Sequence, residues 1–151
     1  MNGILKCLPF PLLIAAISGV AMAIQGTLNA GLSQKTSLYS ATFVVHLIGT
    51  VIALAVILFK HEPLFSQKYL AVPWYFYLGG VLSVVIIALV AVSIPQVGVA
   101  NATTAIIIGQ VSMAILIDHF GWFGTAKMPW NLWQLLGLVL FAVGAKLLFR
   151  I

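Results

Sequence analysis

The stretch "LYSATFVVHLIGTVIALAVILF", Leu38 to Phe59, decides the fold class of this chain. It contains no Asp, Glu, Lys or Arg, and the polar run Lys60-His61-Glu62-Pro63 follows it directly. A helix of about 20 apolar residues crosses the hydrocarbon core of a bilayer, which is roughly 30 Å thick. The stretch therefore predicts a transmembrane helix.

The whole chain has the same apolar character. Of its 151 residues, 63% are hydrophobic and 6% are charged, whereas about a quarter of the residues in a soluble domain are charged. The net charge of +5 comes from Lys and Arg side chains scattered singly between apolar runs. These charges are expected to orient helices in the membrane and not to bind nucleic acid. The single cysteine, Cys7, cannot form an internal disulfide.

Polar breaks divide the chain into five apolar runs, each close to the length that spans a bilayer. The connection between the third and fourth runs is short, which predicts a tight helical hairpin there. We expect an all-α polytopic membrane protein with one transmembrane domain, residues 1–151, and spans at about 9–32, 38–59, 74–94, 98–118 and 132–149.

Several polar side chains interrupt these apolar runs. An unpaired polar group in hydrocarbon costs a few kcal/mol, so each of these groups must face a neighbouring helix or a wet cavity. The spacing places Gln25 and Asn29 on one helix face, and places Asn101 and Thr104 together on another. Gln110 points roughly opposite to Asn101, at about 100° per residue. These five are the candidate solute-binding residues, although ordinary interhelical hydrogen bonds would also explain any one of them.

Two further residues are candidates for coupling or gating. His46 lies within the second run and could bind a proton, but a neutral, hydrogen-bonded core histidine is the simpler interpretation. Asp118 ends the fourth run, where it could carry a proton, cap a cavity or remain an ordinary solvated residue. No second ligand lies near His46 at metal-binding spacing, so we expect no metal and no cofactor. The sequence also lacks a nucleophile–base pair, paired carboxylates and a glycine-rich phosphate loop, so an enzyme is not expected.

The chain resembles the five-helix, single-domain branch of the drug/metabolite transporter superfamily, which is related to EamA-type transporters. The resemblance covers nearly the whole chain, in order and spacing. It rests on "QGTLNAGL" (25–32), "HLIGT" (46–50), "WYFYLGG" (74–80), "IIIGQ" (106–110), "LIDHFGWFG" (116–124) and "LLGLVLFAVG" (135–144).

The resemblance implies a carrier of the cytoplasmic (inner) membrane. It assigns motif positions to Gln25, Asn29, Gly109, Gln110 and Asp118. His46 departs from the family pattern, because an aromatic residue is expected before the Gly49-Thr50 pair.

The usual carrier of this superfamily has ten helices in two inverted halves, and this chain resembles one half. The resemblance therefore implies a dimer, either an antiparallel homodimer or a pair with a related chain. With five spans, the Lys and Arg side chains show almost no bias toward one face, which is compatible with insertion in both directions. The two groups are Lys6, Lys60, Lys68 and Lys127 on one face, and Lys35, Lys146 and Arg150 on the other.

Together these features predict a transporter of a small polar or amphipathic metabolite or drug-like solute, working by alternating access between two five-helix halves. Its expected partners are membrane lipid, the solute and the second half, with no nucleic acid. A non-transporting membrane scaffold or assembly partner, and a channel, are the competing classes of function.

Overall fold

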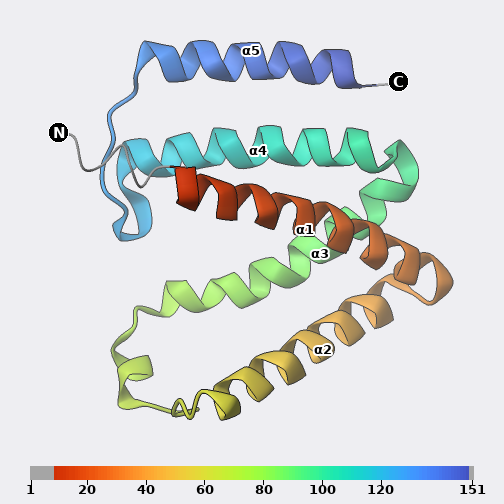
Figure 1. Cartoon of the computed structure of the whole chain (residues 1–151), viewed down its shortest axis with the longest axis vertical. Helices are drawn as coiled ribbons and strands as arrows, with labels where there is room; N and C mark the ends of the chain where they lie inside the picture. Colours follow the sequence, from red (N-terminus) through yellow and green to blue (C-terminus); the bar gives the residue numbers. More distant parts are fainter. Residues whose placement is uncertain (1–8, 150–151) are drawn as a thin grey trace. The chain divides into compact units, whose positions relative to one another are not determined.

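The computed structural model describes residues 9–149, which fold into five α-helices connected by short segments (Figure 1). Lys6, Cys7 and Arg150 lie outside the described residues. Within the described residues, the chain forms two compact units, which divide after Pro95. The bounds of the helices are α1 Pro9–Lys35, α2 Leu38–Phe59, α3 Leu78–Val97, α4 Val99–Phe120 and α5 Leu132–Leu148.

The helices are those of a polytopic membrane protein. Four segments within residues 9–149 are long and apolar enough to cross a bilayer: Phe10–Lys35, Leu38–Phe59, Trp74–Val97 and Val99–Phe120. Helix α5 has 17 residues, which at 1.5 Å per residue give about 26 Å, the lower end of the spanning range. The predicted all-α, polytopic fold is thus confirmed, with four long spans and one shorter apolar helix.

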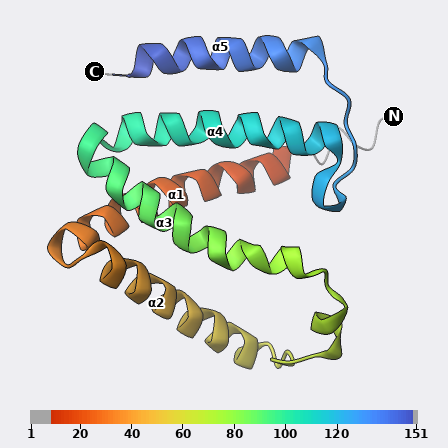
Figure 2. The same cartoon turned by 180° about the vertical axis from the view of Figure 1, so that it is seen from behind.

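In the first unit, α1 and α2 pack against each other near the turn at Thr36-Ser37 and diverge away from it (Figures 1 and 2). The Ser37 hydroxyl caps α2 by accepting a hydrogen bond from the Ser40 backbone N–H at 3.2 Å, which satisfies one orphan donor of the first turn. Ala30 and Ala41, each 3% exposed, lie at similar distances from this turn. Small side chains let helix backbones approach closely in lipid.

Helix α3 contacts both α1 and α2. A Cβ atom at Gly26 would lie 3.0 Å from Val90 Cγ1 and 3.3 Å from Ile94 Cδ1, so only glycine fits at this point without a shift of the neighbours. His46 of α2 forms a hydrogen bond with Ser83 of α3. The first unit therefore combines the α1–α2 packing with a side-chain contact between α1 and α3 and a polar contact between α2 and α3.

The second unit is an antiparallel hairpin of α4 and α5 (Figures 1 and 2). Gly121 ends α4 in the left-handed conformation, with φ 66°, and its N–H bonds the Ile117 carbonyl, as is usual for a glycine after a helix. Asn131 begins α5: its side chain accepts from the Trp133 N–H at 3.0 Å, and Gln134 Oε1 accepts from the Asn131 N–H at 3.3 Å. This reciprocal pair fixes where α5 starts.

The helix bounds differ from the predicted spans mainly at α3. Trp74–Tyr77 form a 3₁₀ turn, and the α-helix begins only at Leu78. Pro95 lies inside α3, which continues to Val97, whereas the predicted span ended at Ile94. Proline removes one backbone N–H, and this loss close to the helix end leaves little helix beyond it to disrupt. Helices α1 and α4 also run past their predicted ends, to Lys35 and Phe120.

The close approach at Gly26 gives a stability prediction. Gly26→Leu is expected to lower the free energy of unfolding by about 1–3 kcal/mol, because the added side chain overpacks against Val90 and Ile94. Gly19→Leu is the matched control on α1, since a Cβ at Gly19 meets nothing within 4 Å. Unfolding by sodium dodecyl sulfate in mixed micelles measures both. Equal stability of the two variants would contradict the close α1–α3 contact.

Candidate functional site

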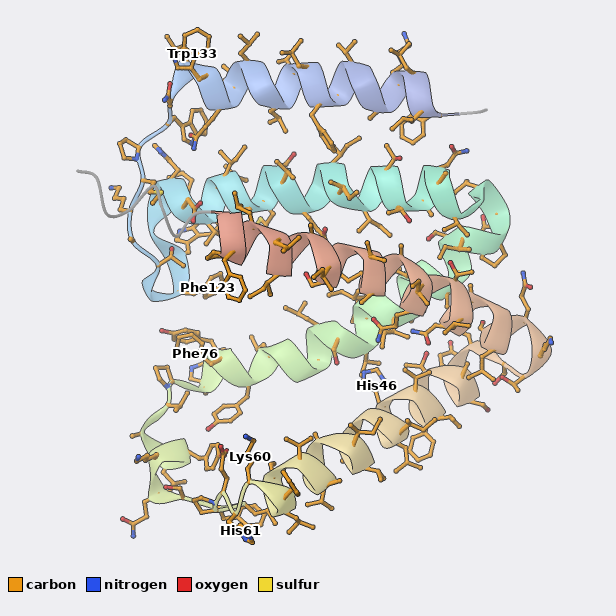
Figure 3. All side chains as sticks on the ribbon, in the orientation of Figure 1. His46, Lys60, His61, Phe76, Phe123 and Trp133 are labelled. Carbon is orange, nitrogen blue, oxygen red and sulfur yellow. The ribbon has the colours of Figure 1, made fainter. Side chains whose placement is uncertain are left out.

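His46 connects α2 to α3 near the middle of the first unit (Figure 3). Its Nδ1 lies 2.8 Å from the Thr42 carbonyl oxygen, one turn back in α2. Its Nε2 lies 2.9 Å from Ser83 Oγ on α3. The Ser83 oxygen also lies 2.9 Å from the Gly80 carbonyl oxygen. His46 is thus a hydrogen-bonded histidine between two helices.

Most hydroxyl groups of these helices are satisfied by their own helix. Ser18 donates to the Ala15 carbonyl at 2.7 Å, Thr27 to Ala23 at 2.9 Å and Thr42 to Leu38 at 2.8 Å. Ser and Thr commonly bond a carbonyl one turn back in this way. Such residues need no further partner in lipid.

Asn29 and Thr104 differ from these hydroxyls. Asn29 on α1 is 7% exposed and Thr104 on α4 is 9% exposed, yet neither side chain has a hydrogen bond within residues 9–149. Thr42, also 7% exposed, is the third buried polar residue of the described part, and its hydroxyl is paired. The polar atoms of Asn29 and Thr104 keep some accessible surface, because His119 Nδ1 is the one buried side-chain polar atom without a partner among the described residues. A polar group without a partner in hydrocarbon costs a few kcal/mol, and a bound solute or water would remove that cost.

Two carboxamides point outward near the middle of apolar helices. Gln25 is exposed on α1, and Gln110 is exposed on α4, about 16 Å from the start of that helix. Exposed carboxamides at this depth would face hydrocarbon in a lone chain, at a cost of a few kcal/mol each. Cover by a partner chain or a water-filled cavity removes this cost.

The remaining candidate residues lie in the second unit. Asn101 is partly buried in the first turn of α4, and Asp118 is exposed near its C-terminal end. Gln25, Asn29 and His46 belong to the first unit, whereas Asn101, Thr104, Gln110 and Asp118 belong to the second. Within the first unit, Asn29 and His46 lie at similar distances from the turn at Ser37, about 12–14 Å along their helices.

A cavity of about 200 Å³ lies between α4 and α5. Apolar side chains form most of its wall, and three polar residues, Ser112, Asn131 and Gln134, also line it. Its complete lining is Ser112, Ile115, Leu116, Trp130, Asn131, Gln134, Leu135 and Leu138. An apolar wall with a few polar groups is typical of a site for an amphipathic molecule. None of the seven residues predicted from the sequence as site residues lines this cavity.

Aromatic rings gather at the end of α4 beside the cavity. The His119 ring lies 4.8 Å from the Trp130 ring and 4.9 Å from the Phe120 ring, which in turn stacks on Trp122 at 5.1 Å. His119 Nδ1 is buried and has no hydrogen-bond partner among residues 9–149. This aromatic cluster holds Trp130 at the cavity edge.

Sequence reasoning missed Ser83 and the cavity-lining residues. Ser83 lies 37 residues from His46, a separation that no helical spacing rule connects. Both Trp130 and Gln134 lie close to the start of α5. From the sequence, Trp130 is interpreted as an aromatic residue at the membrane interface, and Gln134 as part of the helix start. The capping pair Asn131 and Gln134 was the one local signal that could have located the cavity edge, since it fixes the start of α5.

Comparison with known proteins identifies one family. The family model described as "Putative inner membrane exporter, YdcZ" matches residues 10–147. No curated protein and no solved structure matches the chain.

The capping pair at the cavity edge can be tested directly. Asn131→Ala is expected to destabilise the first turn of α5 by about 1 kcal/mol, because the Trp133 N–H loses its acceptor. Asn131→Asp is the matched control, since it keeps an acceptor oxygen at the same place. Amide hydrogen exchange over residues 132–135 reports the change. Faster exchange in both variants, or in neither, would contradict the assigned role.

Proposed function

The chain belongs to the YdcZ family of inner membrane exporters, and from that premise we propose what kind of solute it exports and how its helices form the transport site. It is a multi-pass inner membrane protein and a transporter. We infer that it exports a small polar or amphipathic solute, and that two five-helix halves alternate access to one site. The second half is an oppositely oriented copy of the same chain or a related chain.

The observation that carries this proposal is that Asn29 and Thr104, which are largely buried residues, have no hydrogen bond among the described residues, while their polar atoms stay accessible. A carboxamide and a hydroxyl both donate and accept hydrogen bonds, so they suit a solute with hydroxyl, amide or carboxylate groups. Recognition of a solute would supply the missing hydrogen bonds, and Gln25, one turn from Asn29, extends this polar face.

The exposed carboxamides support the dimer. Gln25 and Gln110 lie far from the ends of apolar helices and remain exposed in the single chain. A second half would cover them or enclose them with water and solute in a shared cavity. In this arrangement Gln25, Asn29, Asn101, Thr104 and Gln110 contribute to solute binding, while His46 and Asp118 are available for coupling or gating.

Apolar replacements of Asn29 and Thr104 distinguish a role in solute binding from a role in folding. Asn29→Leu and Thr104→Val are expected to leave stability unchanged or to raise it, because neither polar group has a hydrogen bond within the described residues to lose. Export is expected to fall at least about tenfold, the factor that corresponds to a lost interaction of 1.4 kcal/mol. Thr42→Val is the control: it is equally buried, its hydroxyl is satisfied within α2, and export should persist.

Export is measured by mass spectrometry of the medium of cells that carry wild-type or variant protein, against cells without it. The solutes enriched by the wild type are then followed in each variant, at matched amounts of folded protein in the membrane. Wild-type export by both Asn29→Leu and Thr104→Val would overturn the proposed site. Loss of stability in both variants would show that these groups have a structural role instead.

Membrane orientation tests the proposed pairing. A protease-sensitive tag on the C-terminus, in sealed vesicles of known orientation, is expected to be accessible in roughly half of the molecules. The expectation follows from the weak charge bias and from an antiparallel homodimer. A single orientation would exclude the antiparallel homodimer and would leave only an oppositely oriented related chain as the second half.

A further inference from the structure

The segment between α2 and α3 is far longer than a connection between neighbouring helices requires. It runs from Lys60 to Tyr77, whereas Thr36 and Ser37 alone join α1 to α2. Helix–helix connections commonly have about 2–8 residues. We call residues 60–77 the surface segment. It joins the ends of α2 and α3 that lie away from the α1–α2 turn (Figures 1 and 2).

Hydrogen bonds within the surface segment give it a defined shape. The Ser66 hydroxyl accepts from the Lys68 N–H at 3.3 Å and begins the 3₁₀ turn Gln67–Ala71. The Tyr77 hydroxyl donates to the Tyr69 carbonyl at 2.7 Å, which ties the end of the segment back to this turn. The surface segment is therefore a folded part of the first unit and not a loose linker.

The surface segment nevertheless turns its apolar side chains outward. Phe65 is 92% exposed and Leu70 is 90% exposed, the highest values among the large hydrophobic residues that the structure describes. Every residue of the segment except Ser66 is exposed. Apolar surface of this kind is unfavourable in water. Because both residues lie beyond the ends of α2 and α3, hydrocarbon covers them only if the segment lies down on the membrane.

Two cations alternate with these apolar residues. Lys60 and Lys68 are exposed, and neither forms an ion pair within residues 9–149. Glu62 is the one acid of the segment. A lysine can lay its stem along apolar surface while its ammonium group stays in a polar layer, and lysines beside a span attract anionic lipid headgroups. Apolar side chains next to cations thus match phospholipid, whose acyl chains lie beneath a layer of phosphate groups.

The two ends of the surface segment lie at the same face of the membrane, because α2 and α3 are consecutive spans. Lys60 follows α2 directly. At the other end, Trp74 is 74% exposed and begins the 3₁₀ turn that precedes α3. Trp and Tyr are enriched at membrane interfaces, where their rings lie at the level of the headgroups. Both ends of the segment are therefore within reach of the same lipid surface.

We propose that the surface segment is a phospholipid-binding anchor. Phe65 and Leu70 insert among the acyl chains at the headgroup boundary, while Lys60 and Lys68 bind phosphate oxygens of anionic phospholipid. The anchor holds the ends of α2 and α3 at the membrane surface. It requires no exported solute, so it stands or falls separately from the proposed function.

Nitroxide labels on single cysteines test the insertion, in a Cys7→Ser background and in vesicles of phosphatidylcholine mixed with phosphatidylglycerol. Oxygen concentrates among the acyl chains and a nickel chelate stays in water, so their effects on the relaxation of the label report its depth. The label at Leu70→Cys is expected to lie about 5–10 Å into the boundary between headgroups and acyl chains. Ile86→Cys, exposed near the middle of α3, is the reference for hydrocarbon, and exposed Glu62→Cys is the reference for water.

A depth of the Leu70 label between those of the two references would support the anchor. A Leu70 label that the nickel chelate reaches as readily as the Glu62 label would overturn it, because the segment would then lie in water. Shielding of the Leu70 label from both reagents would also overturn it, because a protein surface would then cover the segment.

Lysine variants test the choice of lipid. Native mass spectrometry of the full-length protein, in micelles with equal amounts of phosphatidylglycerol and phosphatidylcholine, measures the ratio of the two lipids that stay bound. Lys60→Gln combined with Lys68→Gln is expected to lower this ratio at least about fivefold, because each lysine near anionic lipid contributes roughly that factor.

Lys35→Gln combined with Lys146→Gln is the matched control. It removes the same charge from the last turns of α1 and α5, and the ratio of bound lipids should fall less. An equal fall in both double variants would show that net charge alone selects the lipid, and would overturn the proposal. So would an unchanged ratio in the variant that lacks Lys60 and Lys68.

Discussion

The central constraint on this protein is that a polar side chain within a bilayer must find a hydrogen-bond partner, because hydrocarbon offers none. The helices answer it in three ways. Hydroxyls such as Thr27 and Thr42 bond their own helix one turn back. His46 bonds across to Ser83 and joins two helices. Asn29 and Thr104 are largely buried residues and have no hydrogen bond among the described residues, and we propose that these groups bind the solute.

The second constraint is on helix packing in lipid, where small residues are buried and large apolar residues face the hydrocarbon. Large apolar side chains such as Leu28 and Ile86 face outward and are 68% and 56% exposed, while the buried positions are mostly small. Without a hydrophobic driving force between helices, close packing against small residues replaces it, as where Val90 and Ile94 side chains approach Gly26. The resulting units have little apolar core of their own, so a few polar contacts weigh heavily in their geometry.

The sequence predicted the fold class and the approximate helices, because apolar length and polar breaks follow directly from bilayer thickness. It also placed Asn101 and Thr104 on one face of α4 from helical spacing. It could not show which polar groups pair, since His46 and Ser83 meet only through tertiary packing. The cavity between α4 and α5 was likewise invisible, because the residues around Trp130 and those around Ser112 come together only when the hairpin closes. The predicted end of the third span at Ile94, just before Pro95, was wrong. Helix α3 continues through Pro95 to Val97.

The most direct test of this account is disulfide-free cross-linking of single-cysteine variants in membranes, in a Cys7→Ser background with a short bis-maleimide. Gln110→Cys is expected to form covalent dimers, because in the proposed antiparallel homodimer a second copy covers that mid-membrane carboxamide. Ile86→Cys, exposed near the middle of apolar α3, should remain in lipid as monomer. Asp118→Cys should also remain monomeric, since antiparallel copies put the two Asp118 residues on opposite sides. Monomeric Gln110→Cys, or dimers formed equally by Ile86→Cys, would contradict the claim that a second copy covers this face.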